Sequence, residues 1–172
     1  MRVKTWFGLC LVVSLLSLPD VAIAEDLSGI IATTRTIRED SRLVGDVTCT
    51  VTGAPCIVFG ASHIGLRLNG FTMTGLADPA TGCSGTTQAG EHGISTNGQS
   101  DVEVRGPGIV RQFRAVGVFF TGTLLGRIDD VTVTTNCQSG ILINTTSSRI
   151  TVASNLAMRN GSAQPNFPCG GI

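Results

Sequence analysis

The stretch Gly117-Val-Phe-Phe-Thr-Gly-Thr-Leu-Leu-Gly-Arg-Ile-Asp-Asp-Val-Thr-Val-Thr134 decides the fold of this chain, because its pattern recurs along the sequence. A Gly followed by a β-branched residue opens the stretch, and the same pair stands at Gly93-Ile94, Gly140-Ile141 and Gly171-Ile172. The first three of these marker glycines are 24 and 23 residues apart, and the fourth follows 31 residues later. A period of this size is typical of a solenoid, in which each repeat stacks on the one before it.

Each repeat contains three short alternating runs, which in the middle repeat are Val118–Phe120, Gly126–Ile128 and Val131–Val133. A period of two predicts β-strands and excludes an amphipathic helix. The corresponding runs in the neighbouring repeats are Ile94–Thr96, Val102–Val104, Ile109–Phe113, Ile141–Ile143, Ile150–Val152 and Leu156–Met158. Three strands in about 23 residues predict one turn of a triangular coil, with Gly, Asn and Asp at the corners. The predicted fold class is an all-β solenoid of about five coils.

The same pattern continues upstream of the first marker. Cys56–Phe59, His63–Gly70 and Phe71–Gly75 correspond to the three strands of an earlier coil. The stretch Ile37–Val51 is predicted to be either the opening coil or a strand that covers the end of the core. Leu76–His92 does not fit the repeat, and it is predicted to be a long excursion from one corner.

The two ends of the sequence give expectations about export and completeness. Residues 1–24 have a basic start, an apolar run and an Ala-Ile-Ala end, which predict a secretory signal peptide. The apolar run, Trp6 to Leu18, is too short for a membrane span of roughly 20 residues. We therefore expect a secreted or periplasmic domain over residues 25–172. Because the last residues, Gly171-Ile172, open another repeat, we expect that domain to be truncated at its C-terminal end.

The composition excludes some classes of partner. The chain has 12 Lys plus Arg and 12 Asp plus Glu, so it lacks the basic excess that nucleic-acid binding needs. It has no Tyr, and its one Trp lies in the predicted signal peptide, so six Phe are the aromatic residues of the mature domain. A sugar platform built on Trp or Tyr is therefore excluded.

Cysteines in an exported chain are expected to form disulfides. Cys49 and Cys56 flank a turn-forming stretch, which predicts a bond between them. Cys137 and Cys169 hold nearly the same place in successive repeats, where stacked strands are about 4.8 Å apart, so they form the second predicted pair. Cys83 is left without a partner by this pairing.

Three features together resemble a known group: the segments Leu66–Gly75 and Asp101–Gly108, and the Gly-Ile or Gly-Val starts. The chain resembles bacterial exported right-handed parallel β-helix proteins of the pectate-lyase-like superfamily, from about residue 33 to its end. The resemblance implies a right-handed parallel β-helix. It leaves the activity open, because the superfamily includes lyases, hydrolases, epimerases and adhesins.

Pectate-lyase-like enzymes use an Arg as base within a pattern like Arg-x-x-Pro-x-x-Arg, which makes Arg105 and Arg111 candidate catalytic residues. They flank Pro107, but both spacings differ from the pattern. On a strand, a slip of one residue turns a side chain to the opposite face. The alternative is a Gly-Pro-Gly corner flanked by solvated arginines.

The pair Asp129-Asp130 invites comparison with the paired aspartates of polygalacturonase-like hydrolases, which use two carboxylates as acid and base. Adjacent strand residues point to opposite faces, so the two can share a groove only at a bulge. The alternative comes from the repeat, which places Glu103 beside Arg127 and Arg105 beside Asp129 as an exposed ladder of ion pairs.

Metal binding has weaker candidates. Neither His63 nor His92 has a Cys or His at metal-ligand spacing, which argues against zinc. A calcium site built from Asp78, Glu91 and carbonyl groups of the excursion is the candidate cofactor site, and no other cofactor is expected.

Phe119 and Leu142 form an apolar spot at the outward position two residues after successive markers. This spot is expected to be covered by the excursion, to lie in a groove, or to contact another chain. Taken together, the sequence favours an exported, non-catalytic module that binds extracellular polysaccharide or serves as a structural surface. The alternative is a lyase or hydrolase that acts on acidic polysaccharide.

Overall fold

A computed structural model describes residues 24–78, 80, 83, 89–161 and 171. The predicted signal peptide, apart from Ala24, together with Cys169 and Ile172, lies outside the described residues. Within the described ranges every regular element is a β-strand, and no helix there has the length and apolar character to cross a membrane.

The strands form two parallel sheets. In chain order they are β1 (Glu25–Ile31), β2 (Arg35–Ile37), β3 (Ser41–Cys49), β4 (Ile57–Phe59), β5 (Gly65–Arg67), β6 (Thr72–Thr74), β7 (Ile94–Ser95), β8 (Val102–Arg111), β9 (Val118–Phe120), β10 (Leu124–Thr134), β11 (Ile141–Ile143), β12 (Ser148–Ala153) and β13 (Leu156–Met158). The long sheet has the order β1-β3-β5-β8-β10-β12, with β6 and β13 pairing alongside this path. The short sheet has the order β11-β9-β7-β4-β2.

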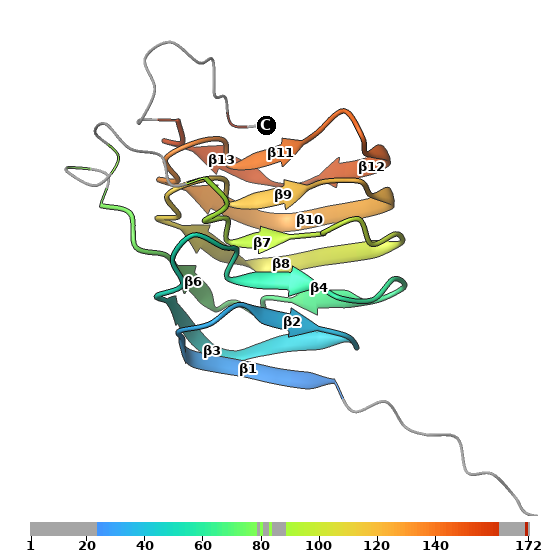
Figure 1. The fold of residues 1–172 in the computed structure, drawn as a ribbon, viewed down its shortest axis with the longest axis horizontal. Helices are drawn as coiled ribbons and strands as arrows, with labels where there is room; N and C mark the ends of the chain where they lie inside the picture. Colours follow the sequence, from blue (N-terminus) through green and yellow to red (C-terminus); the bar gives the residue numbers. More distant parts are fainter. Residues whose placement is uncertain (1–23, 79, 81–82, 84–88, 162–170, 172) are drawn as a thin grey trace, which may run out of the picture.

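Each repeat of the sequence adds one strand layer to both sheets, and we call each such layer a tier. The layers succeed one another from blue β1 to orange β11 and orange-red β13 in Figure 1, in the order of the sequence. The five strands of the short sheet agree with the number of repeats that the sequence predicts. The long sheet gains one further strand, β1, at its edge, where the sequence analysis expected no strand.

The marker glycines lie where successive tiers come closest together. Ile94 is in register with Val118, as is Ile141 on the other side, so the markers stack as expected. A Cβ added to Gly93 would lie 2.5 Å from the carbonyl oxygen of Gly117, and one added to Gly117 would lie 2.7 Å from that of Gly140. The marker is therefore a glycine because the backbone of the next tier leaves no space for a side chain.

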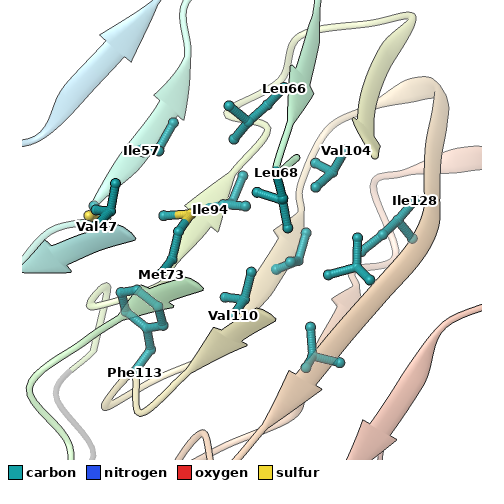
Figure 2. Packing of buried hydrophobic residues seen from close by; sticks show 14 of the residues in the cluster. Val47, Ile57, Leu66, Leu68, Met73, Ile94, Val104, Val110, Phe113 and Ile128 are labelled. Carbon is teal, nitrogen blue, oxygen red and sulfur yellow. The ribbon is translucent and has the colours of Figure 1, made fainter. Parts of the chain in front are cut away.

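Apolar residues of both sheets meet between them in one core. Leu66, Val104 and Ile128 follow one another in register on the inward side of the long sheet, and all three are fully buried. Figure 2 shows these side chains in the same interior as Ile57 and Ile94 of the short sheet. The inward half of the repeat therefore builds a continuous core across the tiers.

The predicted second and third strands of a repeat are continuous in two tiers. In β10 a register shift between Asp129 and Val131 marks the bend between the two limbs. Gly106 of β8 lies against the backbone of Asp130 at this bend, and a side chain there would have no room. The prediction of three separate strands per coil therefore does not hold in these two tiers, because a bulge lets one strand bend without ending.

Polar side chains connect the tiers at the corners. The buried Asn136 accepts a hydrogen bond from the Phe113 N–H, and both its backbone N–H and its amide donate to Asn160, each at 3.0 Å. At the corner four residues after successive marker glycines, the Asn144 amide donates to the Thr121 hydroxyl at 2.9 Å. The Asn136 and Asn160 ladder was not predicted, although its 24-residue spacing follows the repeat.

Candidate functional site

A concave surface lined largely by polar residues lies on the outer face of the long sheet. Two hollows of about 220 and 300 Å³ adjoin there, and both are lined by Asp101 and Glu103. They form one surface, which we call the polar groove. Its charged and titratable lining residues are Asp40, His63, Arg67, Asp101, Glu103, Arg105, Arg127 and Arg149.

The repeat explains why charged side chains gather there. Residues that alternate with the buried Leu66, Val104 and Ile128 must point outward. The register places Glu103 beside Arg127, and Arg105 beside Asp129, which confirms the neighbours predicted from the sequence.

Glu103 is the centre of the ion pairs. Its Oε1 lies 2.9 Å from Nη2 of Arg105 and 3.4 Å from Nε of Arg127. Arg127 also contacts Asp129, at 3.0 Å. These side chains are partly exposed, so each pair contributes less than about 1 kcal/mol to stability.

The other carboxylates of the groove also have partners. Asp40 accepts the backbone N–H of Gly65 at 2.8 Å. Asp101 lies 2.9 Å from Nδ1 of His63, and both side chains are exposed. Every carboxylate that lines the groove is thus held by at least one group of the protein.

Two guanidinium groups are different. Arg67 and Arg149 line opposite ends of the groove, and neither makes a hydrogen bond or ion pair within the described part of the chain. Arg67 is in register with Arg42 on one side and with Arg105 on the other. Like charges on neighbouring strands repel one another. The two charged groups of the groove that lack a partner, Arg67 and Arg149, are both cationic.

Of the four candidate catalytic residues, Arg105, Asp129 and Asp130 lie close together and Arg111 lies apart. Arg105 and Asp129 are neighbours in register, but Glu103 holds the first and Arg127 holds the second. Arg111 follows Arg105 by six residues on β8, a separation of up to about 20 Å along a strand, and its Nε donates to the Thr74 hydroxyl at 3.2 Å.

Asp130 occupies the bend of β10 with a φ of 58°, and its side chain is exposed. The register shift that follows Asp129 is the bulge that a shared groove would require. Asp129, however, is engaged by Arg127, so the two aspartates differ in their surroundings. Catalysis by these residues stays a prediction.

The candidate calcium ligands take part in two different local arrangements. Glu91 is buried, accepts the Gly53 N–H at 2.8 Å and pairs with Arg114 at 3.5 Å. Asp78 accepts the Ala80 N–H at 2.9 Å, as in a turn. Among the residues that the structure describes, no group of three or more His, Cys, Asp or Glu could hold a metal ion.

The apolar spot on the short sheet is partly covered. The ring of His92, at the end of the excursion, lies 4.6 Å from the Phe119 ring, whereas Leu142 beside it is exposed. Nδ1 of His92 accepts the Val116 N–H at 3.3 Å. Burial disfavours the charged imidazole and lowers the pKa of His92 to about 4.

One of the two predicted disulfides is correct and the other is wrong. Cys49 is bonded to Cys56, with Cα atoms 6.0 Å apart. Cys137 is bonded to Cys83 and not to Cys169, because the excursion returns to the corner where Cys137 and Ala77 are buried together. Disulfides of this kind are typical of exported proteins.

Comparison with protein-family models, with curated proteins and with solved structures finds no match to this chain. Its class is therefore defined by its own features. It is an all-β protein of two parallel sheets, with two disulfides and a polar groove across successive tiers of the long sheet.

Proposed function

We propose that this chain is an exported right-handed parallel β-helix protein that binds an anionic extracellular polysaccharide in the polar groove, without cleaving it. The β-helix is supported by strands that return in register once per tier. It is also supported by left-handed residues that recur at one corner, at Gln112, Thr135 and Arg159. Export is supported by the two disulfides and by the predicted signal peptide.

The observation that carries the proposal is the position of Arg67. It stands between Arg42 and Arg105 on neighbouring strands, and it has no carboxylate partner among the described residues. Arg42 is neutralised by Asp26, and Arg105 by Glu103. Arg67 is therefore the arginine of this row that lacks a counter-charge, and a ligand carboxylate would supply one through a charge-assisted, bidentate hydrogen bond.

The second free guanidinium extends the site across the tiers. Arg149 precedes the inward residues of β12, three strand spacings from β5, which is about 14 Å. Two cationic ends with a charge-paired middle fit a polymer that repeats a carboxylate along its length. The lone pairs that Asp101 retains can accept hydrogen bonds from sugar hydroxyl groups.

A lyase or a hydrolase is the less supported candidate. A lyase needs a free base, and a glycoside hydrolase needs two facing carboxylates. Arg105 is held by Glu103, and Asp129 is held by Arg127. These contacts favour binding over catalysis.

The proposal is tested by electrophoresis of the mature protein through gels that contain polygalacturonate, alginate or neutral dextran. We expect retardation by the two acidic polymers and not by dextran, and a weaker effect at high salt. Incubation with the acidic polymers, with and without calcium, should release neither unsaturated products nor reducing ends. Absence of retardation would contradict the binding site. A released product that disappears in Arg105→Ala or Asp129→Ala would establish the enzyme instead.

A further inference from the structure

Leu125 has an unusual backbone conformation for its residue type. Its φ is 62°, in the left-handed region that a bulky side chain rarely adopts. Eleven non-glycine residues of the described part have a positive φ, and the other ten are polar or charged. Leu125 is therefore the one apolar side chain held in this conformation within the described ranges.

The neighbouring tiers show what the same corner otherwise carries. Asp101 and Arg149 are the equivalent residues, with φ values of 53° and 55°. Both are polar, and an aspartate tolerates the left-handed region with little strain. The repeat does not require a leucine at this corner.

Packing does not explain the leucine either. Leu125 is 47% exposed, and it is not a member of the hydrophobic core. The preceding Leu124 is exposed as well, and it is in register with Ser148. The chain thus holds Leu125 in a strained conformation with its side chain in solvent, and such strain is found most often at functional sites.

The position of Leu125 shows what the side chain can contact. It lines the end of the polar groove that also contains Arg127 and Arg149. We infer that Leu125 determines the specificity of this groove by packing against the C–H face of a uronate ring whose carboxylate binds Arg149. The inference rests on the proposed binding of an anionic polysaccharide.

The chemistry of the ligand distinguishes the two contacts. A uronate ring has a carboxylate on one edge and an apolar face made of C–H groups. Arg149 recognises only the negative charge, which any polyanion supplies. Leu125 removes apolar surface from water, so it favours a sugar acid over a polyanion that has no C–H groups.

Isothermal titration of the mature protein with polygalacturonate and with inorganic polyphosphate tests the inference. For Leu125→Gly and Leu125→Asn we expect about tenfold weaker binding of polygalacturonate. Polyphosphate binding should stay at its wild-type value. The melting temperature of both variants should be unchanged or higher, because Gly and Asn adopt the left-handed region readily. Arg149→Gln, as the comparison, should weaken the binding of both polyanions.

Two results would overturn the inference and leave the proposed function standing. One is polygalacturonate binding by Leu125→Gly that is as tight as in the wild type. The other is a clear fall in the melting temperature of both Leu125 variants, which would show that the leucine is kept for stability. A wild-type protein that does not bind polygalacturonate would overturn the proposed function and the inference together.

Discussion

The outer faces of the two sheets differ, although one repeat builds both. The outward row on the long sheet is Asp26, Arg42, Arg67, Arg105, Asp129 and Ala153. The outward row on the short sheet is Thr36, Val58, Ser95, Phe119 and Leu142. The first row is charged at every position except the last, Ala153, and the second has no charge at all. Packing in the shared core constrains the inward residues of both sheets. It does not constrain the outward residues, so the charges on the long sheet indicate a function of that face.

The largest effect is expected where the repeat itself is broken. In Gly117→Ala the new methyl group meets the Gly140 carbonyl oxygen and the Asn136 amide, each at 2.7 Å, and we expect a loss of about 3 kcal/mol of unfolding free energy. Gly65→Ala on the outer face of the long sheet has its nearest neighbour at 3.7 Å and should cost less than about 1 kcal/mol. Urea denaturation measures both, and equal losses would contradict the close stacking of the markers.

Lowering the pH should reduce the stability contributed by groups on the two sheets over different pH ranges. The pKa of His92, beside the short sheet, is lowered by burial from 6.5 to about 4, so the unfolded chain binds a proton that the folded chain refuses. The contribution of His92 to stability is fully present above pH 6.5, and we expect about 3 kcal/mol to be lost as the pH falls to 4. In His92→Gln this loss should disappear.

On the long sheet, the hydrogen bond from Arg42 lowers the pKa of the exposed Asp26 carboxyl below its usual 3.8. Its contribution is therefore present above that pH and is lost as the pH falls through the lowered pKa. Urea midpoints measured from pH 7 to 2.5 separate the two ranges. A loss between pH 6.5 and 4 that persists in His92→Gln would contradict the role of His92.

Removing a carboxylate from the groove should strengthen binding. Glu103→Gln frees the guanidinium groups of Arg105 and Arg127, so we expect polygalacturonate to bind several-fold more tightly. The unfolding free energy should change by less than about 1 kcal/mol. Glu39→Gln, which removes an exposed carboxylate outside the groove, is the matched control and should leave the affinity unchanged. Weaker binding by Glu103→Gln would show that the carboxylate itself holds the ligand.

The smallest effect is expected on the short sheet. Leu142→Ser changes an exposed side chain of the uncharged face, so the dissociation constant for polygalacturonate should stay within about twofold of the wild type. The same titration gives this value. A large loss of affinity would show that the ligand binds to the short sheet and not to the long sheet.

What could be predicted from the sequence follows from the repeat. The close approach of successive backbones imposes a glycine at the start of β7, β9 and β11, and counting from this glycine placed Glu103 beside Arg127. The bond between Cys83 and Cys137 could not be predicted in this way, because the excursion that carries Cys83 has no counterpart in other repeats.

The sequence predicted neighbouring charges in the middle of the polar groove, but not the groove itself. The ion pair of Glu103 with Arg127 follows from the repeat, but the free end at Arg67 lies before the excursion, which interrupts the count. The other end lies at a corner where the left-handed residues, Leu125 and Arg149, are not the Gly, Asn or Asp that usually mark such positions. Because Arg and Leu are not typical of left-handed positions, this corner could not be recognised from the sequence.

The central claim is that the two free guanidinium groups of the long sheet hold an anionic polysaccharide. Isothermal titration of the double variant Arg67→Gln and Arg149→Gln with polygalacturonate tests it most directly. The matched control is the double variant Arg38→Gln and Arg159→Gln, which removes two exposed charges outside the groove. We predict binding at least about tenfold weaker in the first variant and within about twofold of the wild type in the second. Equal affinities in the two double variants would contradict the account.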